Sequence, residues 1–190
     1  EFIVASNTND VLDRFFKAGQ METRTVAPTL SPSMDIQISS NFERLLFEIL
    51  DRDGERVATM FQALQQSGLL SVDQSILAEL RQTWSSCRVD DNQTLETIAH
   101  IYQETGQLID PHTAVGIAAA RENENRNNIP TICLATAHPS KFPEPVQKAT
   151  GVKPELPSHL ADLDQRKEKF SILPNSLEAI KEFILETVRE

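Results

Sequence analysis

The stretch FIVASNTNDVLDRFFKAG, residues 2–19, decides the fold class of this chain. Its first four residues are apolar and have the length of a buried strand. Asn9 is placed to cap a helix over residues 10–17, and Gly19 is placed to end that helix. The stretch therefore predicts a strand followed directly by a helix, which is the repeating unit of α/β proteins.

Two further parts of the chain repeat this pattern. SSCRV, residues 85–89, has the composition of a short strand, after which Asp91 is expected to cap one helix and Pro111 to begin another. A third apolar run, residues 131–135, predicts a third strand. We expect an α/β fold that contains part of a mainly parallel sheet flanked by helices. Because parallel strands need neighbours, we also expect strands from a missing N-terminal portion of the same protein.

The remaining segments are predicted to be helical. A helix is expected from residue 42, and two more near 56–66 and 72–83 form a helical insertion at about 52–83. Apolar residues at 177, 180, 184 and 188 predict an amphipathic helix that closes the chain. We expect one part over residues 1–150 and a tail with the closing helix over 151–190.

Composition excludes several classes of protein. The formal charge of −10, with no Lys/Arg cluster, disfavours binding to nucleic acid. No apolar run approaches the roughly 20 residues that cross a bilayer, so no membrane partner is expected. The two cysteines are far apart and the four histidines lack helical metal-site spacing, so we expect neither a disulfide framework nor a metal. A cytoplasmic protein is the default expectation.

Polar residues follow the predicted strands and begin the predicted helices. In open α/β sheets such positions gather ligands, and Thr136 directly follows the third apolar run. Two interpretations stay open, because Thr136 or Ser140 can also cap a helix that starts near Pro139. Caps are likewise an alternative for Asn9 and Asp110. The other candidates are Asn7, Ser31, Ser33, Asp35, Asn41, Arg44, His112, Thr113, His138 and Lys141.

Four segments together resemble the C-terminal portion of the threonine synthase family. They are FIVASNTNDVLDRFFKAG, TLSPSMDIQISSNFERLLFE, TGQLIDPHTAVG and LATAHPSKFPEPV, which occur in the family's order. The resemblance is weakest over 52–90 and after 150, and Ser140 stands where the family commonly has Ala. It implies a pyridoxal-phosphate lyase of the tryptophan-synthase-β-like fold (fold type II). Such an enzyme converts O-phospho-L-homoserine and water to L-threonine and phosphate in threonine biosynthesis.

The resemblance also implies roles for residues of this chain. Thr136 matches the hydroxyl residue that hydrogen-bonds the pyridine nitrogen of the cofactor, and Asn7 is expected at the cofactor as well. Ser33, Asp35, Asn41 and Arg44 are expected to contact the substrate or its phosphate. The family's Schiff-base lysine and Gly-rich phosphate loop match nothing in residues 1–190, and Lys141 is not a substitute. We therefore expect no catalytic residue here and no activity from this chain alone. The alternative is a noncatalytic α/β binding or interaction module.

Overall fold

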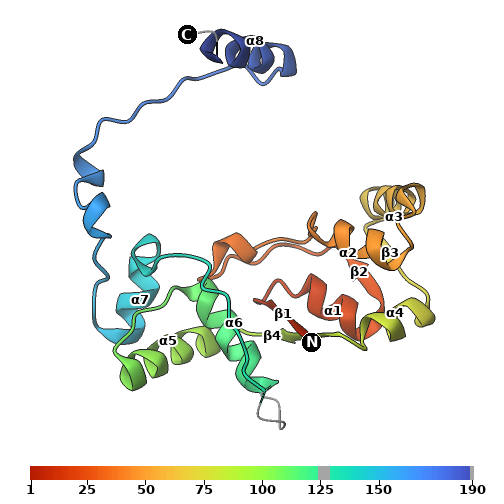
Figure 1. Ribbon diagram of the computed structural model, residues 1–190, viewed down its shortest axis with the longest axis horizontal. Coiled ribbons are helices and arrows are strands. Elements are labelled where there is room, and N and C mark those ends of the chain that lie inside the picture. Colours follow the sequence, from red (N-terminus) through yellow and green to blue (C-terminus); the bar gives the residue numbers. More distant parts are fainter. Residues whose placement is uncertain (124–128, 189–190) are drawn as a thin grey trace. The chain divides into compact units, whose positions relative to one another are not determined.

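The computed structural model describes residues 1–123 and 129–188 (Figure 1). It divides into two compact units, residues 1–155 and residues 156–190. The first unit holds every candidate residue named above, and the second holds the closing helix. We describe each unit by itself.

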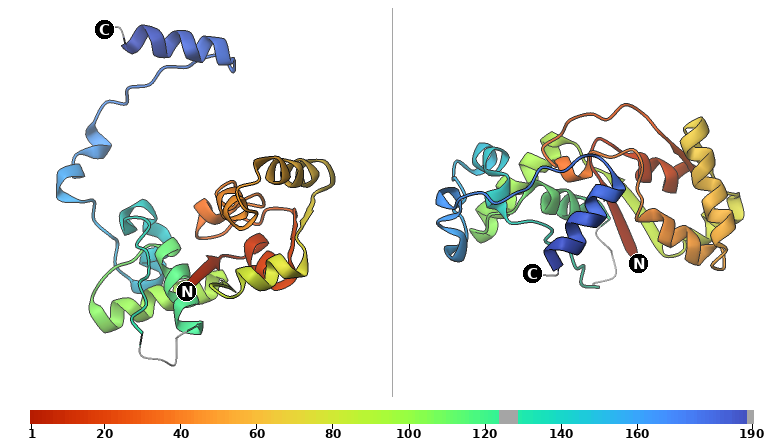
Figure 2. Two further views of the ribbon diagram at one scale, coloured as in Figure 1. Left: turned by 45° about the vertical axis from the view of Figure 1, so that its right-hand side comes forward. Right: turned by 90° about the horizontal axis from the view of Figure 1, so that it is seen from above.

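The first unit is built on two parallel strands. β1 (Phe2–Ser6) pairs with β4 (Trp84–Arg88), and α1 (Val11–Ala18) and α6 (Pro111–Glu122) both contact this pair (Figures 1 and 2). Side chains alternate along β1, so that Val4 packs into the cluster of α1 while Ile3 and Ala5 pack against α6. The layers are thus helix, strand pair and helix. The expected α/β fold with a small parallel sheet is confirmed.

The cluster on the α1 side of the strand pair continues into the helical insertion. β2 (Gln20–Glu22) and β3 (Leu69–Ser71) form a short antiparallel pair that the sequence analysis missed. Their central residues, Met21 and Leu70, are buried among the phenylalanines and leucines of the neighbouring helices. Three residues per strand are too few for alternation to be recognised. The helices are α2 (Phe42–Ile49), α3 (Gly54–Ser67) and α4 (Gln74–Leu80).

The predicted helix ends are correct more often than the predicted starts. Gly19 and Gly106 adopt the left-handed conformation that ends α1 and α5 (Asp91–Thr105). The prediction that Asn9 caps α1 is wrong: Asp10 holds that position, and the Asn9 side chain binds a distant loop. α5 is capped by Asp90 rather than by Asp91, since Asp90 completes a reciprocal capping box with Gln93.

The predicted third strand is wrong. Residues 131–135 form no strand, and Ile132 and Leu134 are 86% and 76% exposed. Within residues 1–123 and 129–188, β1 and β4 pair only with each other, so this segment finds no partner for its backbone groups. Consequently Thr136 does not follow a buried strand in this chain, and Cys133 is only half-buried.

Short helices follow this segment. The helix expected near Pro139 starts as a 3-10 turn (Pro139–Lys141), and the α-helix α7 (Pro143–Thr150) comes after it. Neither Thr136 nor Ser140 caps that turn, because His138 Nδ1 accepts the Ser140 N–H at 3.2 Å. The second unit contains 3-10 turns at Ser158–Leu160 and Leu163–Gln165 and the closing helix α8 (Leu177–Val188), which is confirmed. Among the helices described, none is long and apolar enough to cross a membrane.

Candidate functional site

The loop after β2 is tied to the carboxyl end of β1 by the carboxylate of Asp35. Its Oδ1 accepts hydrogen bonds from the Asn7 amide at 2.7 Å, the Asn9 amide at 2.9 Å and the Thr29 hydroxyl at 2.6 Å. Its Oδ2 accepts the Thr29 N–H at 3.0 Å. A carboxylate with this many donors holds the surrounding backbone in one arrangement.

Asn7 is, together with Ser31, one of the two most buried members of this loop network. It is 1% exposed, and its Oδ1 accepts the Asn9 N–H at 2.8 Å. Its amide nitrogen also lies 2.7 Å from the Thr29 hydroxyl and 3.0 Å from that of Ser31. These contacts use both amide protons of Asn7, so a hydrogen bond donated by Asn7 to the cofactor stays a prediction that requires an exchange of partners.

A second polar network begins α6. Asp110 is fully buried, and its Oδ1 accepts both the His112 N–H at 2.9 Å and the ring Nδ1–H at 2.8 Å. The other oxygen accepts the N–H of Thr113 at 3.3 Å and the Thr113 hydroxyl. The expectation that Asp110 is a cap is confirmed. The carboxylate also orients two side chains that point away from the helix.

These two side chains reach the predicted site segments. His112 Nε2 accepts the N–H of Ser33 at 3.1 Å, which requires the ring proton to be on Nδ1, facing Asp110. Thr113 Oγ1 accepts the N–H of Thr136 at 3.1 Å. A continuous chain of hydrogen bonds therefore links Ser33, a predicted substrate contact, to Thr136, a predicted cofactor contact.

Ser33 and Thr136 are fixed by their backbones and open at their side chains. Both residues are exposed, and neither hydroxyl has a hydrogen-bond partner among the residues described. A hydroxyl that is free on a fixed backbone is suited to a ligand contact. Asp110, His112 and Thr113 are candidates from the sequence alone, but only the structure reveals that they connect the two segments.

Asn41 and Arg44 form a separate pair at the exposed start of α2. Arg44 Nη2 donates to Asn41 Oδ1, and Arg44 makes no ion pair with any carboxylate in the described ranges. Arg44 also lines a hollow of about 300 Å³ together with Phe47 and Val57. No hydrogen bond within the described residues joins this pair to Ser33 or Asp35.

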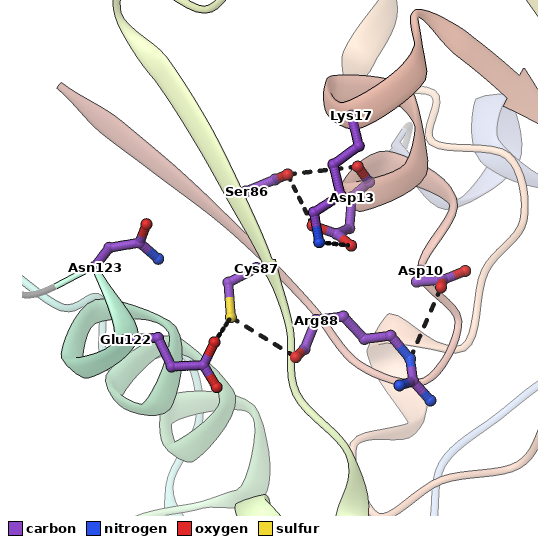
Figure 3. Close-up of a pocket in the computed structure, with 8 residues that line it drawn as sticks. All are labelled: Asp10, Asp13, Lys17, Ser86, Cys87, Arg88, Glu122 and Asn123. Atoms are coloured by element: carbon purple, nitrogen blue, oxygen red, sulfur yellow. Dashed lines mark hydrogen bonds and ion pairs between the residues drawn. The ribbon is translucent and has the colours of Figure 1, made fainter.

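A larger hollow of about 470 Å³ lies along β4 (Figure 3). Ser86 points toward α1, where its hydroxyl donates to Asp13 Oδ1 at 2.8 Å, and Cys87 points toward Glu122 of α6. Burial, together with the hydrogen bond to Glu122, raises the pKa of Cys87 to about 12. The hydrogen bond that Lys17 donates to the Asp13 carboxylate raises the pKa of Lys17. This cluster could not be recognised from the sequence, since its members come from α1, β4 and α6, and its neutral thiol is a poor nucleophile.

Known proteins match this chain over nearly its whole length. Residues 113–184 match the family model described as "Threonine synthase, C-terminal". A threonine synthase of Pseudomonas aeruginosa is 49% identical over 185 residues, which are 97% of this chain and 39% of that protein. The chain belongs to the threonine synthase family. It corresponds to the C-terminal portion of these proteins, as the resemblance implied.

Solved threonine synthases share the fold. A structure titled as pyridoxal-phosphate-bound threonine synthase from Brucella melitensis is 46% identical with a TM-score of 0.87, covering 99% of this chain and 40% of that one. The yeast threonine synthase is 38% identical with a TM-score of 0.84, covering 100% and 42%. The chain thus spans about 40% of the length of the threonine synthases it matches.

The matched parts include both polar networks. The family model for the threonine synthase C-terminus begins at Thr113 and contains Thr136. The loop network around Asn7 and Asp35 lies before that range, in the part of this chain that is also similar to the threonine synthases of Pseudomonas aeruginosa and Brucella melitensis. Both halves of the hydrogen-bonded chain therefore lie in regions similar to the family.

Proposed function

We propose that the intact protein is a threonine synthase, which converts O-phospho-L-homoserine and water to L-threonine and phosphate with pyridoxal 5'-phosphate as cofactor. The observation that carries the proposal is the likeness to a pyridoxal-phosphate-bound threonine synthase at 46% identity and a TM-score of 0.87. That likeness extends over 99% of this chain. The reaction and the substrate are those that the family resemblance implies.

Thr136 is our candidate for the contact to the ring nitrogen. When bound, the cofactor supplies an electron sink for the reacting carbon. A neutral hydroxyl partner does not hold a full positive charge on the ring nitrogen, so it moderates how strongly the ring withdraws electrons. The exposed Thr136 hydroxyl, on a backbone held 3.1 Å from Thr113 Oγ1, supports this role. Asn7 is the second candidate, and it holds residues 29–35 in place in either case.

Arg44 is our candidate for the substrate phosphate. Its guanidinium is exposed, has no carboxylate partner in the described parts of the chain, and suits a phosphate. Asn41 orients it through the contact to Nη2. The free hydroxyl of Ser33 is a further donor, whereas the carboxylate of Asp35, which already accepts four hydrogen bonds, holds the loop that lines the substrate.

This chain supplies one wall of the proposed site and no catalytic base. We assign the Schiff-base lysine and the Gly-rich phosphate loop to the portion of the family that this chain does not span. The exposed apolar segment 131–135 and the two-stranded parallel sheet support pairing with strands from that portion. We place the reaction in the cytoplasm, which agrees with the two free cysteines.

Phosphate release by the purified intact protein tests the function. We expect release from O-phosphohomoserine only with the cofactor bound, and none from residues 1–190 alone. Arg44→Gln should raise KM about tenfold, since one charge-assisted contact is lost. Arg56→Gln, an exposed arginine of α3 that pairs with Asp73, should leave KM unchanged. An intact protein that binds the cofactor and releases no phosphate would support the noncatalytic module instead.

A further inference from the structure

We propose that Thr113 and His112 are positioning residues of the active site, oriented by the buried carboxylate of Asp110. Thr113 holds the backbone of Thr136 and thereby aims its hydroxyl at the cofactor. His112 holds the backbone of Ser33 and thereby aims its hydroxyl at the substrate. The inference rests on the proposed function for the roles of Thr136 and Ser33, and it assigns a separate task to each branch of the network.

Asp110 fixes both branches because each of its oxygens has two donors. One oxygen receives the backbone and the ring N–H of His112, and the other receives the backbone and the hydroxyl of Thr113. The residue is fully buried, so no water competes for these positions. A charged acceptor in a buried site makes stronger hydrogen bonds than a neutral one.

The hydroxyl of Thr113 has a single proton, and that proton is used toward Asp110. Its lone pairs are therefore left as the acceptor for the Thr136 N–H at 3.1 Å. Thr136 comes directly after the segment 131–135 that we propose to pair with strands outside this chain, so the Thr113 hydroxyl holds the backbone at the point where that pairing ends. The Thr113 hydroxyl therefore has a direct influence on the position of Thr136.

The imidazole of His112 is oriented in the same way. Asp110 accepts the proton of Nδ1, which leaves Nε2 unprotonated and able to accept the Ser33 N–H at 3.1 Å. The ring of Phe142 packs against the imidazole with a centroid distance of 4.6 Å, which restricts its rotation. An ordinary helix cap needs only the two backbone N–H groups, so these outward contacts go beyond capping.

Four substitutions in the intact protein separate the branches. Thr113→Val removes the hydroxyl with little change of shape, and Thr113→Ser keeps it. His112→Asn keeps a donor for Asp110 but is too short to reach Ser33, whereas His112→Gln keeps an acceptor near the position of Nε2. Thr97→Val is the matched control, because Thr97 is a buried threonine whose hydroxyl donates only within its own helix.

Hydrogen exchange measured by mass spectrometry reports how firmly the amides of Thr136 and Ser33 are held, and it needs no substrate. We expect Thr113→Val to speed exchange at the Thr136 amide and not at the Ser33 amide, and His112→Asn to do the reverse. In turnover, Thr113→Val should lower kcat about tenfold and change the absorbance of the bound cofactor, with KM little changed. His112→Asn should raise KM several-fold with a smaller change in kcat, and the Ser and Gln variants should recover most of each loss.

A purely structural role would give a different pattern. If Thr113→Val and His112→Asn lowered the melting temperature and altered kcat and KM alike, or if neither amide exchanged faster, the positioning proposal would be overturned. A wild-type protein without phosphate release would overturn the proposed function, and the exchange data would still decide whether the two branches act separately.

Discussion

β1 and residues 131–135 have similar sequences and different fates. Both are short apolar runs that predict a buried strand, and each is followed by a hydroxyl or amide residue. β1 pairs with β4 and is covered by α1 and α6, whereas residues 131–135 pair with nothing in the described chain and expose Ile132 and Leu134. An apolar pattern therefore shows that a segment is able to form a strand, but whether the strand forms depends on a neighbouring strand with a free edge.

Phe15→Ala tests the core that covers β1, and its expected effect on stability is the largest. Phe15 is fully buried beside β1 and makes edge-to-face contacts with Phe16 and Phe42. Its truncation leaves a cavity and should lower the free energy of unfolding by about 3–5 kcal/mol. Urea unfolding of the intact protein measures the loss. A change below about 1 kcal/mol would mean that this core is not a stabilising centre.

The reactivities of the two cysteines compare the paired strand β4 with the unpaired segment 131–135. Cys87 lies in β4 with its pKa raised to about 12 by burial and by Glu122, and Cys133 lies half-buried in the unpaired segment. At a given pH below 9, a pKa three units above an ordinary thiol lowers the thiolate fraction of Cys87 about a thousandfold. We expect iodoacetamide to modify Cys133 first in native protein, and both alike in urea. Faster modification of Cys87 would contradict its assigned environment.

The same raised pKa predicts how stability depends on pH. In the unfolded chain the pKa of Cys87 is the ordinary thiol value of 9.0, and burial and Glu122 raise it to about 12 in the folded chain. Between these values the unfolded state binds fewer protons, so the free energy of unfolding falls as pH rises, by up to about 1.4 kcal/mol per unit. Below pH 9 the contribution is constant. Cys87→Ala should remove this part of the pH dependence of the free energy of unfolding. An unchanged dependence above pH 9 would contradict the raised pKa of Cys87.

Substitutions of Thr136, which follows the unpaired segment 131–135, test that region through activity rather than through stability. In the intact protein, Thr136→Val should leave the ring nitrogen of the cofactor unpaired, at a cost of about 1–3 kcal/mol in the transition state. Thr136→Ser should retain most activity. Steady-state phosphate release and cofactor absorbance measure both variants, and turnover should fall more than substrate binding. A fully active Val variant beside an impaired Ser variant would make Thr136 a packing position.

Ile132→Ala has the smallest expected effect and sharpens the comparison. At 86% exposure, its truncation should change the stability of the 190-residue chain by less than about 0.5 kcal/mol. If strands of the intact protein cover this segment, the same substitution should cost about 1 kcal/mol or more there. Equal effects in the two proteins, measured by urea unfolding, would contradict that pairing.

Much of the fold was predictable because its signals are local. The strand at β1, the glycines that end α1 and α5, and Pro111 at the start of α6 all act within one or two turns of the chain. The short pair of β2 and β3 was missed because three-residue strands carry no period. The start of α1 was misassigned because an Asn9 side chain can bind either a helix end or a distant loop, and here it donates to Asp35 in the loop.

The candidate site divides in the same way. From sequence alone came the fold class, the family resemblance and the polar residues that follow apolar runs, since composition, period and motif are properties of neighbouring residues. Only the tertiary structure decided that Asp110 orients His112 toward Ser33 and Thr113 toward Thr136, because these contacts join residues 79 and 23 positions apart. It also decided that residues 131–135 stay unpaired, since a strand forms only where another backbone presents its hydrogen-bonding edge.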